Sequence, residues 1–150
     1  MSSASVGTWP PSRSPRSIFI DRSIGKRTAF ALAILGLEPL WIGEVYEQDG
    51  RFIDDLVWIH EAAEHGYPVL TKDRRIWVNP DEVHAVKDSG ARVFVIGDGQ
   101  ISAVKMAALF GRHFLPVRRR MRVDGGCLWI LRPDKQIERR HETRRSRPRR

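Results

Sequence analysis

The stretch "YPVLTKDRR" (Tyr67–Arg75) joins a short apolar run to one carboxylate, Asp73, which stands among three basic residues. The run has the length and composition of a short buried strand, which we place at residues 68–72. Aspartate is disfavoured inside strands, so Asp73 marks the point where the strand ends. It is either a turn-forming residue or a carboxylate presented at the end of the strand for chemistry, and the rest of the chain bears on that choice.

Working outward from this strand, apolar runs alternate with segments of helical character. The expected strands are residues 17–21, 39–46, 68–72, 92–97 and a last one within 127–133, placed at a sheet edge. The expected helices are 25–38, with apolar spacing at Phe30, Ile34 and Leu37; 54–66, with Leu56, Ile59 and Ala63; 79–90; and 101–111. This alternation predicts an α/β fold in three layers: a mostly parallel sheet of four to five strands with helices on both faces.

The chain length of 150 residues fits one domain, which we place at residues 17–132. Residues 1–16 are rich in Ser, Pro and Arg and are expected to form a disordered tail. Residues 133–150 are expected to form a basic C-terminal tail. The net charge of +8 is concentrated late in the chain, because residues 116–150 hold 13 Lys and Arg against 4 Asp and Glu. This pattern favours a polyanionic partner such as nucleic acid, although a purely solubilising tail has the same composition.

Cysteine content and hydropathy bear on location. Cys127 is the only cysteine, which excludes a disulfide framework and favours a reducing, cytoplasmic setting. The N-terminal residues lack the apolar core of a signal peptide. The longest apolar run, "AFALAILGL", is too short to cross a bilayer, so no membrane association is expected.

Three acids are expected to meet at one edge of the sheet: Asp21, Asp55 and Asp73. Asp21 ends the first strand, Asp73 follows the third, and Asp55 opens the helix that leads into the third strand. The carboxyl ends of parallel strands share an edge, which is where open α/β sheets bind ligands. Three carboxylates without a Cys or His set favour Mg²⁺ or Mn²⁺, which can orient water and polarise a phosphodiester. Each acid also has a structural alternative as a helix cap or turn residue.

Neighbouring charges could complete such a site. A fourth acid could come from Glu44, Glu47, Asp49 or Asp98, each of which also has a solvated-surface or turn alternative. Lys72, Arg74 and Arg75 flank Asp73, and Arg118, Arg119 and Arg120 begin a second basic run. These six bases are candidates for holding an RNA backbone, because Lys and Arg make most phosphate contacts.

The segments that carry these acids resemble the PIN domain family. "IFIDRSIG", "DLVWI" and "LTKDRRI" match, in order, the opening strand with its first acid, the acid that starts a helix, and the strand that leads to a T-x-D motif. The resemblance extends over roughly residues 18–115. More closely, the chain resembles a compact PIN-like group related to VapC-type toxins.

This resemblance implies a parallel α/β fold, metal-dependent RNA cleavage by Asp21, Asp55 and Asp73, and an antitoxin protein as a partner. It also implies a homodimer, since PIN domains often dimerise. The family usually carries a further glutamate on a longer insert before the second of these acids. Here Glu44 or Glu47 would have to replace it, and a non-catalytic RNA-binding PIN-like module is the alternative function.

Overall fold

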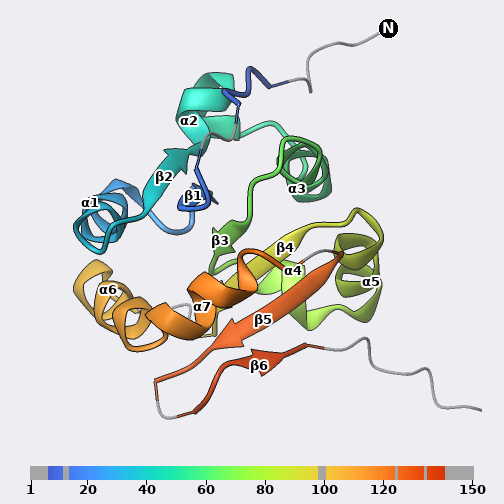
Figure 1. Ribbon diagram of the computed structural model, residues 1–150. Coiled ribbons are helices and arrows are strands. Elements are labelled where there is room, and N and C mark those ends of the chain that lie inside the picture. Colours follow the sequence, from blue (N-terminus) through green and yellow to red (C-terminus); the bar gives the residue numbers. More distant parts are fainter. Residues whose placement is uncertain (1–6, 12–13, 98–100, 124, 134, 141–150) are drawn as a thin grey trace, which may run out of the picture.

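A mostly parallel sheet forms the centre of the fold (Figure 1). The computed structural model describes residues 7–11, 14–97, 101–123, 125–133 and 135–140. Within these residues the sheet has six strands in the order β2-β1-β3-β4-β5-β6, one more than the upper limit we expected. The strands are β1 (Ser17–Ile20), β2 (Glu38–Trp41), β3 (Val69–Thr71), β4 (Arg92–Ile96), β5 (Cys127–Leu131) and β6 (Glu138–Arg139). The first five are parallel, and β6 pairs antiparallel with β5.

Helices cover both faces of the sheet, so the three-layer α/β prediction is confirmed (Figure 1). One face packs against α2 (Ile42–Val45), α3 (Asp55–Glu64), α4 (Arg74–Val78) and α5 (Pro80–Asp88); a 3₁₀ turn, η1 (Glu47–Gly50), follows α2. The other face packs against α1 (Lys26–Ile34), α6 (Ala103–Arg112) and α7 (Phe114–Arg120). Strand side chains alternate between the two cores: Phe19 belongs to the first, Ile18 and Ile20 to the second.

The segment 39–46, which we predicted as one strand, is a strand followed by a helix. β2 ends at Trp41, whose backbone N–H donates to Glu44 Oε2 at 2.8 Å. This bond satisfies a donor at the start of α2. Ile42 and Val45 are three residues apart and both are buried, as one face of a helix requires. A continuous apolar run does not distinguish this arrangement from an extended strand.

The first helix buries a different face from the one we predicted. Phe30 is 74% exposed and Ile34 is 86% exposed, whereas Thr28 and Leu32 are buried. Two positions correspond to about 200° around a helix, so the buried face lies opposite to the expected one. In α3 the shift is smaller: Ile59 is buried as expected, but Leu56 is exposed. Trp58 and Ala62 complete the buried face of α3.

Three further features differ from expectation in the second half of the chain. The short helices α4 and α7 were not predicted; Pro116 lies in the first turn of α7, where proline is tolerated. β5 is not an edge strand, because β6 pairs with it (Trp129 opposite Arg139). Part of the expected basic tail therefore belongs to the sheet.

The N-terminal segment that we expected to be disordered packs on the fold at residues 7–11. Trp9 lies against the first core, and its indole N–H donates to Glu61 Oε1 at 2.9 Å. Thr8 N–H donates to the carbonyl of Val45, and Tyr67 Oη–H donates to that of Pro10. The first six residues lie outside the described part of the chain.

Candidate active site

The three predicted acids line one pocket of about 280 Å³ at the carboxyl ends of β1 and β3. Asp21 comes directly after β1, Asp55 is the first residue of α3, and Asp73 is the N-cap of α4. The rest of the lining is contributed by Arg22, Ser23, Ile42, Gly50, Ile53, Trp58 and Arg75. The pocket thus combines three carboxylates with two guanidinium groups in a partly enclosed space.

Asp21 is the most buried of the three carboxylates, with 5% of its surface exposed. It does not cap a helix: α1 has Gly25 at its N-cap and no side-chain cap bond. Instead its two oxygens accept from Ser23 Oγ at 2.5 Å and Thr71 Oγ1 at 2.8 Å. Burial first, and then the charges of Asp55 and Asp73, raise the pKa of Asp21 to about 6, although these two hydrogen bonds act to lower it.

Asp55 and Asp73 share one cation, the guanidinium of Arg75. Arg75 Nη2 lies 2.7 Å from Asp73 Oδ2 and 3.3 Å from Asp55 Oδ2. Burial and then the charge of Asp73 raise the pKa of Asp55, against the opposing charge of Arg75. Burial also opposes ionisation of Asp73, but hydrogen bonds from the Arg75 side chain and backbone outweigh it, and the pKa of Asp73 is lowered. The pair therefore has unequal proton affinities.

The pocket suits a hard divalent cation, because its candidate ligands are the carboxylate oxygens of three aspartates. Burial is the main cause of the raised pKa of Asp21, and the charges of Asp55 and Asp73 add to it; a bound cation would favour the ionised carboxylate against both effects. The side chains are not arranged as a preformed metal centre, however: within the described residues no three His, Cys, Asp or Glu groups could hold a metal ion together. Arg75 occupies the space between two of the candidate ligands.

The acids considered as a fourth ligand do not join this pocket where the structure describes them. Glu44 caps α2, and Glu47 and Asp49 are exposed in η1. All three lie outside the pocket lining. Asp98 lies outside the described residues. The usual glutamate of the family therefore has no counterpart among the described acids we considered.

The six candidate RNA-binding residues do not form one surface but lie in different parts of the structure. Arg75 lines the acidic pocket, whereas Lys72 and Arg74 do not. Arg118 lies over the ring of Phe114, 5.8 Å from its centroid. Arg119 and Arg120 line another cavity, between α7 and the residues before β6.

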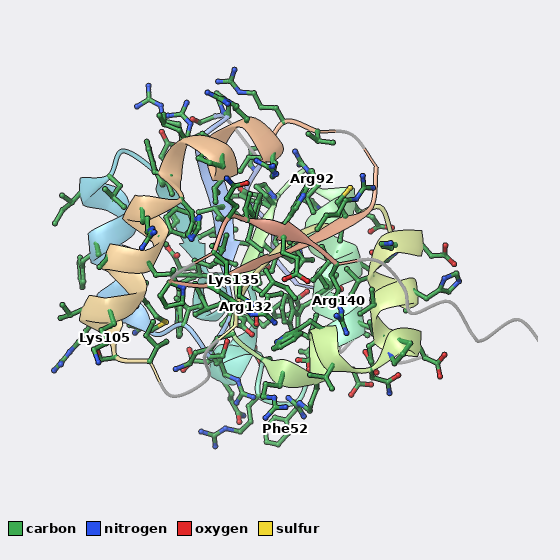
Figure 2. The ribbon with its side chains drawn as sticks, turned by 90° about the horizontal axis from the view of Figure 1, so that it is seen from below. Phe52, Arg92, Lys105, Arg132, Lys135 and Arg140 are labelled. Carbon is green, nitrogen blue, oxygen red and sulfur yellow. The ribbon has the colours of Figure 1, made fainter. Side chains whose placement is uncertain are left out.

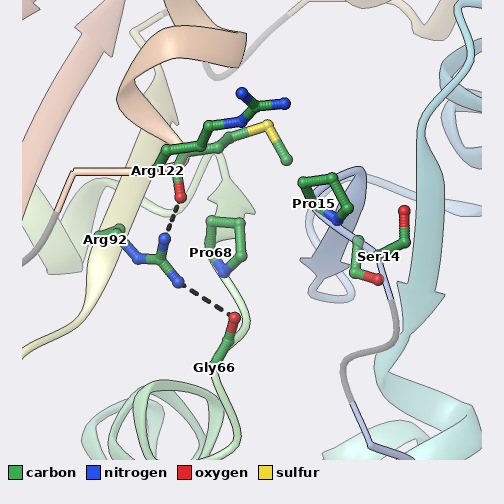
Figure 3. Close-up of a pocket in the computed structure, with 8 residues that line it drawn as sticks. Ser14, Pro15, Gly66, Pro68, Arg92 and Arg122 are labelled. Atoms are coloured by element: carbon green, nitrogen blue, oxygen red, sulfur yellow. Dashed lines mark hydrogen bonds between the residues drawn. The ribbon is translucent and has the colours of Figure 1, made fainter.

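A separate cavity of about 370 Å³ lies at the amino ends of the strands (Figure 3). Arg92 extends into it and donates to the carbonyls of Gly66 and Met121. These bonds tie the ends of α3 and α7 to β4, which is a structural role.

Three residues that hold the pocket acids in place were missed when the sequence was considered alone. Ser23 and Thr71 hold Asp21, and Trp58 donates from Nε1 to Asp55 Oδ1 at 3.2 Å. Ser23 belongs to the D-x-S sequence that follows the first strand, and Thr71 to the T-x-D sequence that begins at the last residue of the third strand. Trp58 is 2% exposed, so it packs in the core and also donates a hydrogen bond to Asp55.

The chain belongs to the PIN-like domain family: the family's sequence model, described as "PIN like domain", matches residues 17–98. That span runs from the first residue of β1 to just beyond β4 and contains all three pocket acids. Within the described residues, no helix is long and apolar enough to cross a membrane.

Two curated proteins are similar to this chain. One is "Putative ribonuclease VapC45" of Mycobacterium tuberculosis, 31% identical over 122 residues, or 80% of this chain and 88% of that protein. The other is "Eukaryotic translation initiation factor 3 subunit L" of Brugia malayi, 35% identical over 68 residues, or 42% of this chain and 12% of that protein. No solved structure matches.

Proposed function

We propose that this protein is a metal-dependent endoribonuclease, the toxin of a type II toxin–antitoxin pair. The observation that carries the proposal is the convergence of Asp21, Asp55 and Asp73 on one pocket at the carboxyl edge of the sheet. The family membership and the similarity to a protein named as a ribonuclease support it. In this proposal the three carboxylates are the catalytic residues and hold Mg²⁺ or Mn²⁺.

A divalent cation held there would polarise an RNA phosphodiester and lower the pKa of a bound water. The chain's own residues prepare the pocket for this chemistry. Ser23 and Thr71 fix the orientation of Asp21, and Trp58 fixes that of Asp55. Arg22 and Arg75 place positive charge beside the acids, where a phosphate group would otherwise be repelled. Arg75 must leave its two carboxylates for all three to become ligands.

Partners and location follow from the same proposal. An antitoxin protein would bind the folded toxin and suppress its activity, and two copies of the chain would form a homodimer. A cytoplasmic location fits an RNA substrate and the free, buried Cys127. Expression of the chain alone should arrest growth of the host cell, and light scattering would measure the homodimer.

The decisive experiment compares RNA cleavage by the wild-type protein with that by Asp73→Asn, in Mg²⁺, in Mn²⁺ and in EDTA. Asp54→Asn is the matched control, because Asp54 is the adjacent acid to Asp55, is exposed and lies outside the pocket. We expect metal-dependent cleavage by the wild type and Asp54→Asn, and a loss of at least 100-fold in Asp73→Asn. Equal cleavage by both variants would overturn the assignment.

The alternative function is a non-catalytic RNA-binding PIN-like module. The ion pairs from Arg75 to Asp55 and Asp73 favour it, because they neutralise two acids without a metal. In that case the wild type binds RNA with the same affinity in Mg²⁺ and in EDTA and cleaves it in neither.

A further inference from the structure

A basic groove lies on the opposite side of the sheet from α3 and α4. Its volume is about 490 Å³, and we define it by its lining: Arg112, His113, Pro116, Arg119, Arg120, Lys135, Gln136 and Ile137. One wall is the end of α6 and the outer side of α7. The other is formed by Lys135, Gln136 and Ile137, which come just before β6. Arg132 and Arg140 lie on the two sides of these residues in the sequence (Figure 2).

Both walls of the groove present positive charge to the space between them. Arg112, Arg119 and Arg120 come from the helical wall and Lys135 from the facing segment. Among the described lining residues there is no Asp or Glu to neutralise them. Arg112, Arg119 and Lys135 are exposed, so their charged groups remain available to a ligand from solvent. Cations that converge from two elements form a concave anion site rather than a scattered basic surface.

A buried histidine holds the two walls together. His113, at the junction of α6 and α7, is 5% exposed, and its Nε2 donates to the carbonyl of Arg132 at 2.9 Å. On the helical wall, Arg120 Nη1 donates to the carbonyl of Pro116 at 3.2 Å, which orients its guanidinium. The groove is therefore organised before a ligand arrives, and less conformational entropy is lost on binding.

We propose that the basic groove binds the phosphate backbone of RNA at a site separate from the acidic pocket. Guanidinium forks match phosphate oxygens, and three of the four cations are arginines. Further positive charge continues beyond the groove at Arg118 on α7 and at Arg139 and Arg140 around β6. Because the positive charge extends beyond the groove, it matches a long polymer with regularly spaced negative charges better than a short acidic peptide.

The groove and the acidic pocket share no lining residue among those described. β3, which leads to Asp73, and β5, which leads to Arg132, are separated in the sheet by β4 alone. The two strands are thus about 10 Å apart. One RNA could therefore contact both sites, with the groove holding a segment away from the bond to be cleaved. This inference deepens the proposed ribonuclease function and rests on it for the identity of the polyanion.

The test measures binding of a fluorescent single-stranded RNA by anisotropy, in the Asp21→Asn background so that the RNA stays intact. The groove variant is Arg112→Gln with Arg119→Gln. The matched control is Arg16→Gln with Arg122→Gln: two exposed arginines at the amino ends of the strands, outside the groove. Both variants lose two positive charges, and all four side chains are exposed, so folding should persist.

We expect the groove variant to bind RNA at least tenfold more weakly at 0.1 M salt, and the control less than twofold. The slope of log K against log salt should fall by about 1.4 in the groove variant, because each phosphate contact to a single strand contributes about 0.7. Lys135→Gln alone should weaken binding in the same direction. Equal losses in the groove variant and the control would overturn the inference, as would an acidic peptide binding the groove more tightly than RNA.

Cleavage by the otherwise wild-type protein, measured separately, keeps the two proposals distinguishable. If the protein cleaves RNA and the groove variant and the control lose equal RNA-binding affinity, the groove proposal is rejected and the ribonuclease proposal is retained. If only the groove variant loses RNA-binding affinity and the protein cleaves no RNA in any metal, the ribonuclease proposal is rejected and the groove proposal is retained.

Discussion

Arg75 donates to both carboxylate oxygens of Asp73, from its backbone N–H at 3.0 Å, from Nε at 3.2 Å and from Nη2 at 2.7 Å. The side chain of Asp73 is 16% exposed, whereas that of Arg75 is 77% exposed. The carboxylate is therefore fixed while the guanidinium can move into solvent. The guanidinium of Arg75 therefore supplies positive charge at the place where the proposed metal would bind, and it can leave that place.

Replacing Arg75 by Gln should increase the affinity of the pocket for Mn²⁺ severalfold, because the metal no longer competes with the guanidinium. Isothermal titration calorimetry measures this directly, without any assay of cleavage. Arg74→Gln is the control, since Arg74 is the adjacent exposed arginine and does not line the pocket. A lower Mn²⁺ affinity in Arg75→Gln would show instead that Arg75 helps to assemble the site.

The raised pKa of Asp21 predicts a pH dependence of stability. Its pKa is about 6 in the folded protein, against 3.8 for an unperturbed aspartate, the value expected in the unfolded chain. The protonated carboxyl therefore favours folding below pH 3.8, and this contribution is lost as the pH rises through about 6. The loss amounts to roughly 3 kcal/mol at about 1.4 kcal/mol per pKa unit.

Asp21→Asn should remove this penalty. Urea unfolding in EDTA should show the variant to be more stable than wild type at pH 7.5, by about 1–3 kcal/mol, and closer to it at pH 4.5. Addition of Mg²⁺ should stabilise only the wild type, because the variant lacks one ligand. If wild type were the more stable protein at pH 7.5 in EDTA, its ionised carboxylate would have to be stabilised by its surroundings.

Two buried threonines provide a matched pair. Thr71 Oγ1 donates to Asp21 and accepts from Asp73 N–H at 3.1 Å, whereas Thr28 Oγ1 is buried without a hydrogen-bond partner among the described residues. Thr71→Val should lower the unfolding free energy at pH 7 by about 1–3 kcal/mol, and Thr28→Val should leave it unchanged or raise it. Comparable losses in both would mean that threonine packing, and not the bond to Asp21, is what matters.

The sheet and its acidic edge were predictable because strong local signals and topology agree. The strands at 17–20, 69–71 and 92–96 are short apolar runs flanked by helix signals, and parallel strands must bring Asp21 and Asp73 to one edge. The helix starting at Asp55 was equally clear, since Gly66, which follows its C-cap, has a positive φ of 79° that stops the helix.

The errors arose where tertiary contacts decide between local alternatives. Ile42 and Val45 continue the apolar run of β2, but they form a helix whose start is capped by the bond from Trp41 N–H to Glu44 and whose buried side packs in the first core. The buried side of α1 depends on where the helix lies relative to α6, which packs beside it (Figure 1). The pairing of Arg75 with two acids likewise depends on α3 and α4 meeting in space, which residue spacing does not reveal.

The N-terminal segment gives the last prediction, because its composition resembles a disordered tail but Trp9 anchors it. The Trp9 ring stacks on His65 at a centroid distance of 5.3 Å and lies 4.9 Å from Phe19, while its N–H and the backbone N–H of Gly7 both donate to Glu61 Oε1. Trp9→Ala should therefore lower the unfolding free energy by about 2–4 kcal/mol in urea titration.

Trp9→Phe separates packing from hydrogen bonding in the same measurement. It keeps an aromatic ring against Phe19 but leaves Glu61 with one donor fewer, so we expect a loss of about 1 kcal/mol. Glu61→Gln keeps an acceptor oxygen and should cost less than Trp9→Ala. A Trp9→Ala protein as stable as wild type would show that residues 7–11 lie on the fold without stabilising it, as the composition alone had suggested.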